Sequence, residues 1–445
     1  MTIEVDIVKR ETIKPSSPTP PELRHFKLSL FDQFYPIFYT PLILFYAGSD
    51  PSEAAQEKSR RLTTSLPEVL TRFYPFAGRI VDNLSLGCVD QGAEYLEAVV
   101  NCDLSRVLKE PDTAVLRTFL PATADIERAD ATTMPLVLVQ ANFFECGGSA
   151  IGLCVMHKVA DAEALCTFVN AWAGTATGAI TEAMIPEFRT ASMFPPLDSL
   201  ANSFPSIVPA KEKCVRRRFL LESSKVAALR KRIEGPGGPA STAVEAVSAL
   251  LWKCSATASR KKKANLNKME TPRTTMLSQT VNLRRRMEPQ LPSNLAGNLA
   301  GYFLTRADER EMEMRVLAVR LREALEGYCE SHVKRLQGDG ACAAICEETK
   351  EFGELLGKSL VMDEMDFYSC TSWCRFPFYE ADFGWGRPVW ACQESADCPN
   401  FFMLMDARDS GGIEVCLTLR EEDMALFEQD PDLLEFASLN PTIRG

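Results

Sequence analysis

Two short apolar runs, residues 136–142 and 150–156, limit most strongly what this chain can fold into. Runs of this length without polar alternation are typical of strands buried in a sheet that helices cover on both faces. Residues 52–70 are helix-compatible and place Leu62, Leu66 and Val69 at apolar positions. Buried strands next to such helices predict an α/β protein.

The middle of the chain changes character between residues 189 and 211, where prolines, serines and asparagines replace periodic apolar positions. Such composition is typical of a linker. We therefore expect a first domain at 1–188, a crossover linker at 189–211 and a second domain at 212–445. Each domain is large enough for its own mixed α/β core.

The second half also mixes strands with helices. We expect strands at 218–221, 369–375, 401–406 and 414–419, and helices at 223–233, 241–256 and within the charged region 310–358. The basic run 260–263 has two interpretations, a solvated loop or an edge that neutralises phosphate groups.

The charge balance and the cysteines limit the possible partners. Lysine plus arginine number 49 and the acids 60, so 49 − 60 = −11, and the chain lacks the basic surface that dominates nucleic-acid affinity. An anionic membrane is disfavoured for the same reason. The 15 cysteines lack the paired spacing of a zinc site, which favours buried thiols in a reducing compartment. No secretory signal and no apolar stretch of about 20 residues is visible, so we expect a cytosolic protein.

Only three histidines, His25, His157 and His332, could supply an imidazole base near neutral pH. His25 and His332 lie among charged neighbours and are expected at the surface. His157 follows an apolar strand, and Asp161 can begin the next helix, where α/β proteins present reactive side chains. Two interpretations stay open at this point: a catalytic base, or a strand-end histidine satisfied by its surroundings.

Other catalytic patterns are missing from the sequence. Residues 147–151 lack the last glycine of a nucleophile elbow, and residues 235–240 do not match the dinucleotide fingerprint. No phosphate-binding GxxxxGK[ST] loop occurs. His157 and Asp161 lack further visible ligands, so we expect no metal.

A second motif narrows the choice, because residues 382–386 read DFGWG. HxxxD at 157–161 followed by DFGWG resembles the BAHD family of plant acyltransferases that use coenzyme A thioesters. Over the chain as a whole, the sequence is similar to the vinorine-synthase-like branch of this family. The resemblance takes in LSLFD at 28–32, YPFAGR at 74–79, VNLR at 281–284 and GN at 297–298, and so covers nearly the whole chain.

The resemblance implies two similar-sized domains of the chloramphenicol-acetyltransferase type, with mixed sheets, flanking helices and a channel at the domain interface. His157 would be the general base in mid-channel, between acyl-CoA on one side and the acceptor alcohol on the other. Thr371 matches the family position proposed to stabilise the oxyanion. Asp161 and Arg284 would pair as site architecture.

The same resemblance assigns the DFGWG loop to the architecture of the channel and its coenzyme A side, through Asp382, Gly384, Trp385 and Gly386. The phosphates of coenzyme A need local positive charge in this acidic chain. The visible candidates are Lys261, Lys262, Lys263, Arg284, Arg285 and Arg286.

The implied function is acyl transfer, other than of aminoacyl groups, onto a hydroxyl of a specialised metabolite such as an alkaloid. Acetyl-CoA would be the co-substrate, without a tightly bound cofactor, in a monomer. N-acylation is a variant, and the alternative is a family member that binds a metabolite without acyl transfer or catalyses another reaction. Ala162 replaces a glycine common after the aspartate, which a helix start accepts. The signature YFGNC is absent at 302–306, which argues against anthocyanin malonylation.

Overall fold

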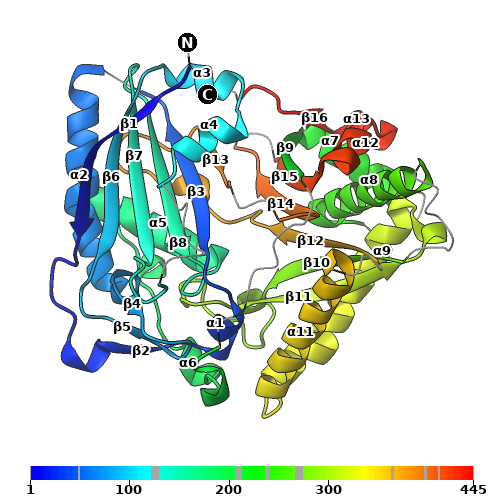
Figure 1. Cartoon of the computed structure of the whole chain (residues 1–445), viewed down its shortest axis with the longest axis horizontal. Helices are drawn as coiled ribbons and strands as arrows, with labels where there is room; N and C mark the ends of the chain where they lie inside the picture. The colour runs from blue at the N-terminus through cyan, green and yellow to red at the C-terminus, as the bar shows by residue number, and fades with distance from the viewer. Residues whose placement is uncertain are drawn as a thin grey trace.

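The structure is a computed structural model that describes residues 2–48, 51–121, 130–203, 205, 213–235, 240–265, 274–361, 365–394, 398–408 and 411–443. Two large mixed sheets, each with its own helices, lie side by side in this part of the chain (Figure 1). This is the α/β arrangement that the buried apolar runs predict.

The first sheet comes mainly from the N-terminal half. Its six strands run in the order β1 (Val5–Ile13), β6 (Ala93–Val100), β7 (Val137–Phe144), β8 (Ser149–Met156), β3 (Tyr39–Tyr46) and β13 (Trp390–Cys392). A small sheet holds β2 (His25–Lys27), β5 (Ser85–Gly87) and β4 (Arg79–Ile80). The helices of this half are α1 (Leu30–Phe34), α2 (Pro51–Arg72), α3 (Leu104–Lys109), α4 (Thr113–Thr118), α5 (Ala162–Thr177) and α6 (Thr190–Met193).

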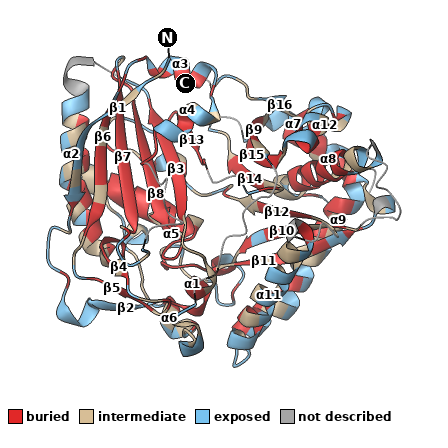
Figure 2. Cartoon of the chain, viewed as in Figure 1, coloured by how far each residue is buried: buried red, intermediate tan, exposed pale blue. Residues whose placement is uncertain are grey.

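Strands β7 and β8 confirm the prediction from the two apolar runs, because every residue of both strands is buried (Figure 2). Their lack of alternation reflects cover on both faces. Helix α5 lies behind these strands in the view of Figure 1 and packs against α2. The predicted helix at 52–70 is confirmed as α2.

The second sheet has seven strands, in the order β11 (Ala300–Ala307), β10 (Thr275–Asn282), β12 (Asp366–Ser372), β14 (Phe401–Asp406), β15 (Ile413–Arg420), β9 (Cys214–Leu221) and β16 (Ser438–Leu439). Its helices are α7 (Ser223–Glu234), α8 (Ala243–Asn265), α9 (Met314–Tyr328), α10 (Lys334–Leu336), α11 (Ala341–Leu356), α12 (Glu421–Phe427) and α13 (Pro431–Phe436). These elements confirm the strands and helices expected in this half. The parallel pairing of β12 with both β10 and β14 makes the sheet mixed.

A segment of the C-terminal half belongs to the first sheet in space. Strand β13 pairs antiparallel with β3, Trp390 opposite Phe45, and the two rings stack with centroids 5.2 Å apart. The apolar side chains of Phe378 and Phe383, just before β13, are buried in the same core. Burial of these aromatic rings explains why the chain crosses between the halves. The domain limits 1–188, 189–211 and 212–445 stay a prediction.

The predicted linker is partly ordered. Helix α6 lies within it, and the backbone of Phe194, which is buried, accepts a hydrogen bond from Leu30 of α1. Residues 204 and 206–211 of the linker lie outside the described residues.

The basic run 260–263 is the end of helix α8, so the expectation of a loop is wrong. Alanines and long-chain residues sustain the helix there. Lys263 Nζ lies 2.8 Å from a carboxylate oxygen of Asp366, and Lys262 Nζ lies 3.7 Å from Asp423. Only 15% of the Lys262 and 11% of the Lys263 side chain is exposed, so two of these charges face protein carboxylates.

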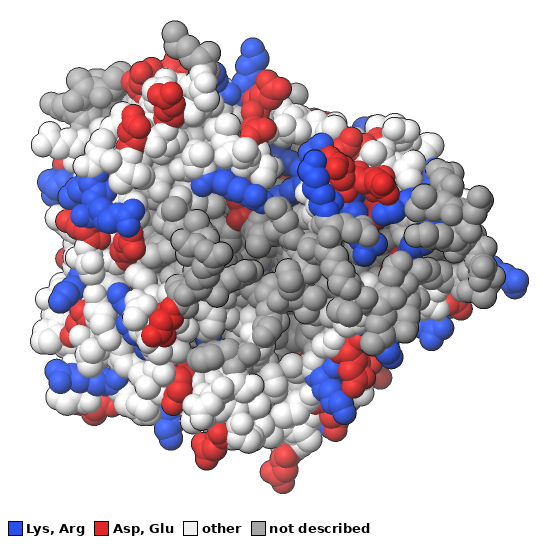
Figure 3. Space-filling model, viewed as in Figure 1, with Lys and Arg blue, Asp and Glu red and all other residues white. Residues whose placement is uncertain are grey.

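Acidic and basic side chains are interspersed over the face shown in Figure 3. Among the described helices, none combines the length and the apolar character needed to cross a bilayer. The cysteines are free thiols, mostly buried or half-buried, although Cys342 and Cys398 are exposed.

Candidate active site

His157 lies directly after the last residue of β8, at the seam between the two halves. Its backbone N–H donates to Phe38 O at 2.9 Å, which fixes the chain at the strand end. The imidazole stacks on the ring of Tyr35, with centroids 4.3 Å apart and planes inclined by 10°. The ring of Phe38 lies 4.9 Å away. His157 stays partly exposed, so one strand end presents a reactive group between two aromatic walls.

Asn298 contacts the imidazole from the other half of the chain. Its Nδ2 donates to His157 O at 2.8 Å and to Asp32 Oδ1 at 2.8 Å, so its amide oxygen points at the ring. His157 Nδ1 lies 3.1 Å from that oxygen. An oxygen can only accept, and Nδ1 therefore carries the proton while Nε2 is the basic nitrogen.

Asp32 anchors this arrangement from helix α1. Its Oδ2 accepts hydrogen bonds from the backbone and side chain of Ser29, forming the capping box that begins the helix. Its Oδ1 accepts from the backbone N–H of Asn298 at 2.9 Å as well as from the amide. One buried carboxylate thus joins a helix start to the asparagine that orients the base.

Burial lowers the pKa of His157 below its ordinary value of 6.5. Desolvation is the largest cause, because it disfavours the charged imidazolium. The imidazole is consequently neutral at pH 7, the form that can accept a proton from an alcohol.

Asp161 points away from the imidazole and into a buried ion pair. Its two carboxylate oxygens lie 2.6 and 3.2 Å from the guanidinium of Arg284, whose side chain is 1% exposed. Asp161 also caps α5 by accepting from Ala164 N and accepts from Leu299 N. Arg284 further donates to the carbonyls of 295 and 297. The pair therefore fixes the loop that carries Asn298 relative to the first residues of α5.

Thr371 lies half-buried on β12, opposite Met403 of β14. Met403 packs in the core of the first sheet, so this row of the second sheet faces the first. Side chains directly opposite on neighbouring strands point to the same face. Thr371 thus faces the first sheet across the seam.

The DFGWG loop is held by its own aspartate. Asp382 Oδ1 accepts from the backbone N–H of Gly384 at 2.7 Å and of Gly386 at 3.0 Å. Both glycines have positive φ, +98° and +100°, which side chains disfavour. The ring of Phe383 stacks on Trp385 with centroids 5.5 Å apart.

The same loop packs entirely against the first half. Phe383 makes an edge contact with Trp172 of α5, with centroids 4.9 Å apart, and its carbonyl accepts from Arg61 of α2 at 3.3 Å. Lys58 Nζ lies 5.6 Å from the Trp385 ring centroid. These contacts attach the motif, which lies late in the sequence, to the core of the first sheet.

The remaining candidate cations differ in their surroundings. Lys261 is exposed near the end of α8, and about half of the Arg285 side chain is exposed, 3.6 Å from Glu163. Arg286 is exposed on the same turn. These three residues offer charge to solvent, whereas Lys262, Lys263 and Arg284 face protein carboxylates.

The other two histidines differ in their exposure to solvent. His25 is exposed on β2, as expected. His332 lies in a π-helical turn at 329–333, and its ring stacks on Tyr328 with centroids 4.9 Å apart. Its Nε2 lies 3.1 Å from Glu348, and 14% of the side chain is exposed. The surface expectation for His332 is wrong, because the ring packs on Tyr328 and reaches Glu348 of α11.

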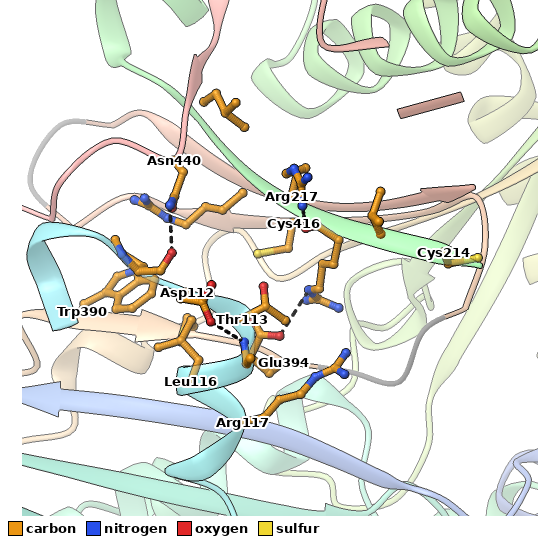
Figure 4. Close-up of a pocket in the computed structure, with 17 residues that line it drawn as sticks. Asp112, Thr113, Leu116, Arg117, Cys214, Arg217, Trp390, Glu394, Cys416 and Asn440 are labelled. Carbon is orange, nitrogen blue, oxygen red and sulfur yellow. Dashed lines mark hydrogen bonds and ion pairs between the residues drawn. The ribbon is translucent and has the colours of Figure 1, made fainter. Parts of the chain in front are cut away.

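A cavity of about 480 Å³ opens where α4 meets β9 and β13 (Figure 4). Its wall includes Trp390, Asn440 and three consecutive arginines, 216–218. His157 and Thr371 are not among its lining residues. The proposed base therefore does not line this cavity, and the channel at the domain interface stays a prediction.

Sequence reasoning gave no role to three residues that touch or orient the base: Tyr35, Asp32 and Asn298. Asp32 and Asn298 belong to the LSLFD and GN stretches that support the family resemblance. Their occurrence in those stretches was the available signal. The contact of Asn298 with His157 joins residues 141 positions apart in the sequence, and Asp32 acts through Asn298.

Comparison with known proteins places these features in context. The chain matches the model of the Transferase family over residues 3–434. Akuammiline synthase 1 from Alstonia scholaris is 37% identical over 434 residues, covering 97% of each chain. Stemmadenine O-acetyltransferase from Catharanthus roseus is 35% identical over 437 residues, again covering 97% of each chain.

The fold has a close counterpart among solved structures. The crystal structure of vinorine synthase aligns with a TM-score of 0.83 at 33% identity, covering 99% of this chain and 100% of that chain. The vinorine synthase sequence from Rauvolfia serpentina is 35% identical over 435 residues, 96% of each chain.

Proposed function

Because the chain belongs to the BAHD family of acyltransferases, we propose that it is an O-acetyltransferase that esterifies a hydroxyl of a bulky plant specialised metabolite. Acetyl-CoA is the proposed donor, and an alkaloid is one proposed class of acceptor. One relative, stemmadenine O-acetyltransferase from Catharanthus roseus, is named for O-acetylation of stemmadenine, which supports the choice of an acetyl group and of a hydroxyl acceptor.

The geometry of His157 carries the proposal. Asn298 occupies Nδ1, burial keeps the ring neutral, and Nε2 is the nitrogen left to take a proton. An alcohol becomes an adequate nucleophile only when a base removes its proton during attack, which is worth about 10²- to 10⁴-fold in rate.

The proposed reaction conserves every proton. Nε2 of His157 accepts the hydroxyl proton while the alcohol oxygen bonds to the thioester carbonyl carbon. The carbonyl oxygen becomes an oxyanion, which the hydroxyl of Thr371 stabilises as a hydrogen-bond donor. Cleavage of the carbon–sulfur bond releases coenzyme A thiolate, and the imidazolium returns the proton to sulfur. The products are an ester and free coenzyme A.

The supporting residues have separate proposed tasks. Asp161 and Arg284 hold the loop of Asn298, and the DFGWG loop with Asp382, Gly384, Trp385 and Gly386 shapes the channel and its coenzyme A side. Among the cations proposed for coenzyme A, Lys261 and Arg285 are the better candidates, because Lys262 and Lys263 face Asp423 and Asp366. We further propose a cytosolic monomer, since free thiols persist in a reducing compartment.

Acetyl transfer is tested by incubating the full chain with acetyl-CoA and a panel of polycyclic alkaloid, terpenoid and phenolic alcohols. Intact mass of the products and release of free thiol are measured together. We expect a product heavier by one acetyl group, lost in His157→Ala and retained in the matched control His25→Ala, whose side chain is exposed.

Three outcomes would contradict the proposal. Transfer that persists undiminished in His157→Ala would remove the base. An acetylated amine with no ester would replace O-acylation by N-acylation. Metabolite binding without any coenzyme A release across the panel would favour the alternative of a binding protein.

A further inference from the structure

Lys158, the residue after the base, is fully buried. Its ammonium donates to three backbone carbonyls, those of Asp32 at 3.0 Å, Gln33 at 3.3 Å and Tyr35 at 2.7 Å. A lysine side chain is among the least often buried, so this placement needs a reason.

The three carbonyls belong to the end of helix α1, which spans only five residues. The last carbonyls of a helix lack partners within the helix. Lysine offers three donors on one atom, so a single side chain contacts all three oxygens. Asp32 O also accepts from the backbone N–H of Tyr35, and Gln33 O also accepts from the side-chain amide of Asn83. Lys158 thereby acts as a cap for the C-terminal end of α1, opposite the capping box at Ser29.

Helix α1 and the residue that follows it support the two groups that orient the imidazole, Asn298 and Tyr35. Asp32 holds Asn298, whose oxygen fixes the protonated nitrogen of His157. Tyr35 covers one face of the imidazole. Lys158 directly follows His157 in the chain. Its side chain therefore links the positions of Asp32 and Tyr35 to the backbone next to the base.

We propose that Lys158 is a positioning residue for acyl transfer, which locks α1 so that Asp32, Asn298 and Tyr35 hold the imidazole of His157 in one tautomer and one orientation. Lys158 touches no reacting atom. The inference rests on the proposed role of His157 as the base. The inference adds Lys158, the second residue of HxxxD, to the residues that set the geometry of the base.

The test combines nuclear magnetic resonance of ¹⁵N-labelled histidine with steady-state kinetics. The chain has only three histidines, so the His157 signals are assigned by their loss in His157→Gln. In the wild type at pH 7.5 we expect a single tautomer with the proton on Nδ1. In Lys158→Met we expect a mixture of tautomers, and a kcat lower by about 10²-fold with little change in the KM for acetyl-CoA.

Lys58→Met is the matched control, because Lys58 is also buried and donates to a backbone carbonyl, that of Gly147 at 2.8 Å. We expect it to lower the thermal midpoint while leaving the tautomer of His157 unchanged. A general loss of packing would instead disturb the His157 signals in both variants, and that result would overturn the proposal.

Lys158→Arg keeps the experiment decisive if Lys158→Met does not fold. A planar guanidinium keeps the charge but cannot direct three donors from one atom at three converging carbonyls. We expect a smaller shift in the same direction. A wild-type tautomer in a folded Lys158 variant would overturn the proposal. The resonance reports on the ring without turnover, so failure to find an acceptor would count against acetyl transfer alone.

Discussion

Oδ1 of Asn298 and Nδ1 of His157 lie 3.1 Å apart, although the two residues belong to different halves of the chain. The base sits at the end of a strand in the first sheet, and the group that sets its tautomer precedes β11 of the second. The halves must therefore dock correctly before the imidazole has a defined basic nitrogen.

Replacing Asn298 by alanine tests this contact. The variant leaves Nδ1 without its acceptor, so both tautomers become accessible and kcat is expected to fall by about 10²-fold. Initial rates with acetyl-CoA measure the effect. Asn294→Ala is the control, because Asn294 is half-buried on the same loop and its side chain donates to Ile185 O, not to the imidazole, in the described contacts. Equal loss in both variants would indicate a change in the loop and not in the base.

The pH dependence of the rate follows from the lowered pKa of His157. The neutral imidazole is the active form, and burial keeps the ring neutral to a lower pH than in an unfolded chain, where the pKa is 6.5. We expect kcat to be flat around pH 7 and to fall only as pH drops through a value below 6.5. A rate that already falls between pH 8 and 7 would show a base with a raised pKa and contradict this environment.

Breaking the Asp161–Arg284 pair is expected to cost stability. Asp161→Asn leaves the buried guanidinium with only the more distant carboxylate of Glu163, 3.9 Å away, and we expect the free energy of unfolding in urea to fall by about 3–5 kcal/mol. The exposed pair of Arg189 with Glu187 supplies the comparison, since Arg189→Met should cost less than about 1 kcal/mol. Similar losses at the two sites would show that burial does not strengthen the inner pair.

The two glycines of DFGWG offer a matched steric test. Both have φ near +100°, so alanine at either position strains the backbone by about 1–3 kcal/mol. A Cβ at position 384 would also lie 1.9 Å from Arg61 Nη1, whereas position 386 is open. We expect Gly384→Ala to lower the thermal midpoint more than Gly386→Ala. The added variant Arg61→Ala should reduce the further loss caused by Gly384→Ala, and an unchanged difference would exclude this clash.

Charge reversal separates the candidate coenzyme A contacts. Lys261→Glu and Arg285→Glu change exposed charges, so a true contact raises the KM for acetyl-CoA while the thermal midpoint stays near the wild type. Lys263→Glu places a second negative charge beside Asp366, so we expect it to lower the thermal midpoint. A KM unaffected by reversal at 261 and 285 would assign the phosphates to other residues.

The sequence alone determined the elements and the two motifs. Uninterrupted apolar runs specified β7 and β8, because a strand covered on both faces needs no polar alternation. The run that ends at Met156 placed His157 at a strand end, and the aspartate four residues on was expected to begin α5, which it caps. HxxxD and DFGWG together pointed to the family.

Only the tertiary structure decided the partners of the base. Asp32 and Asn298 are 266 residues apart in the sequence, and local periodicity contains no information about a contact of that range. The same reason explains why two expectations were wrong, the loop at 260–263 and the surface position of His332. A charged stretch of sequence does not show which acidic side chains lie opposite it. Lys263 of α8 pairs with Asp366 of β12, and His332 lies next to Glu348 of α11. Pattern fixes which residues are reactive; docking of the halves decides which of them are oriented to react.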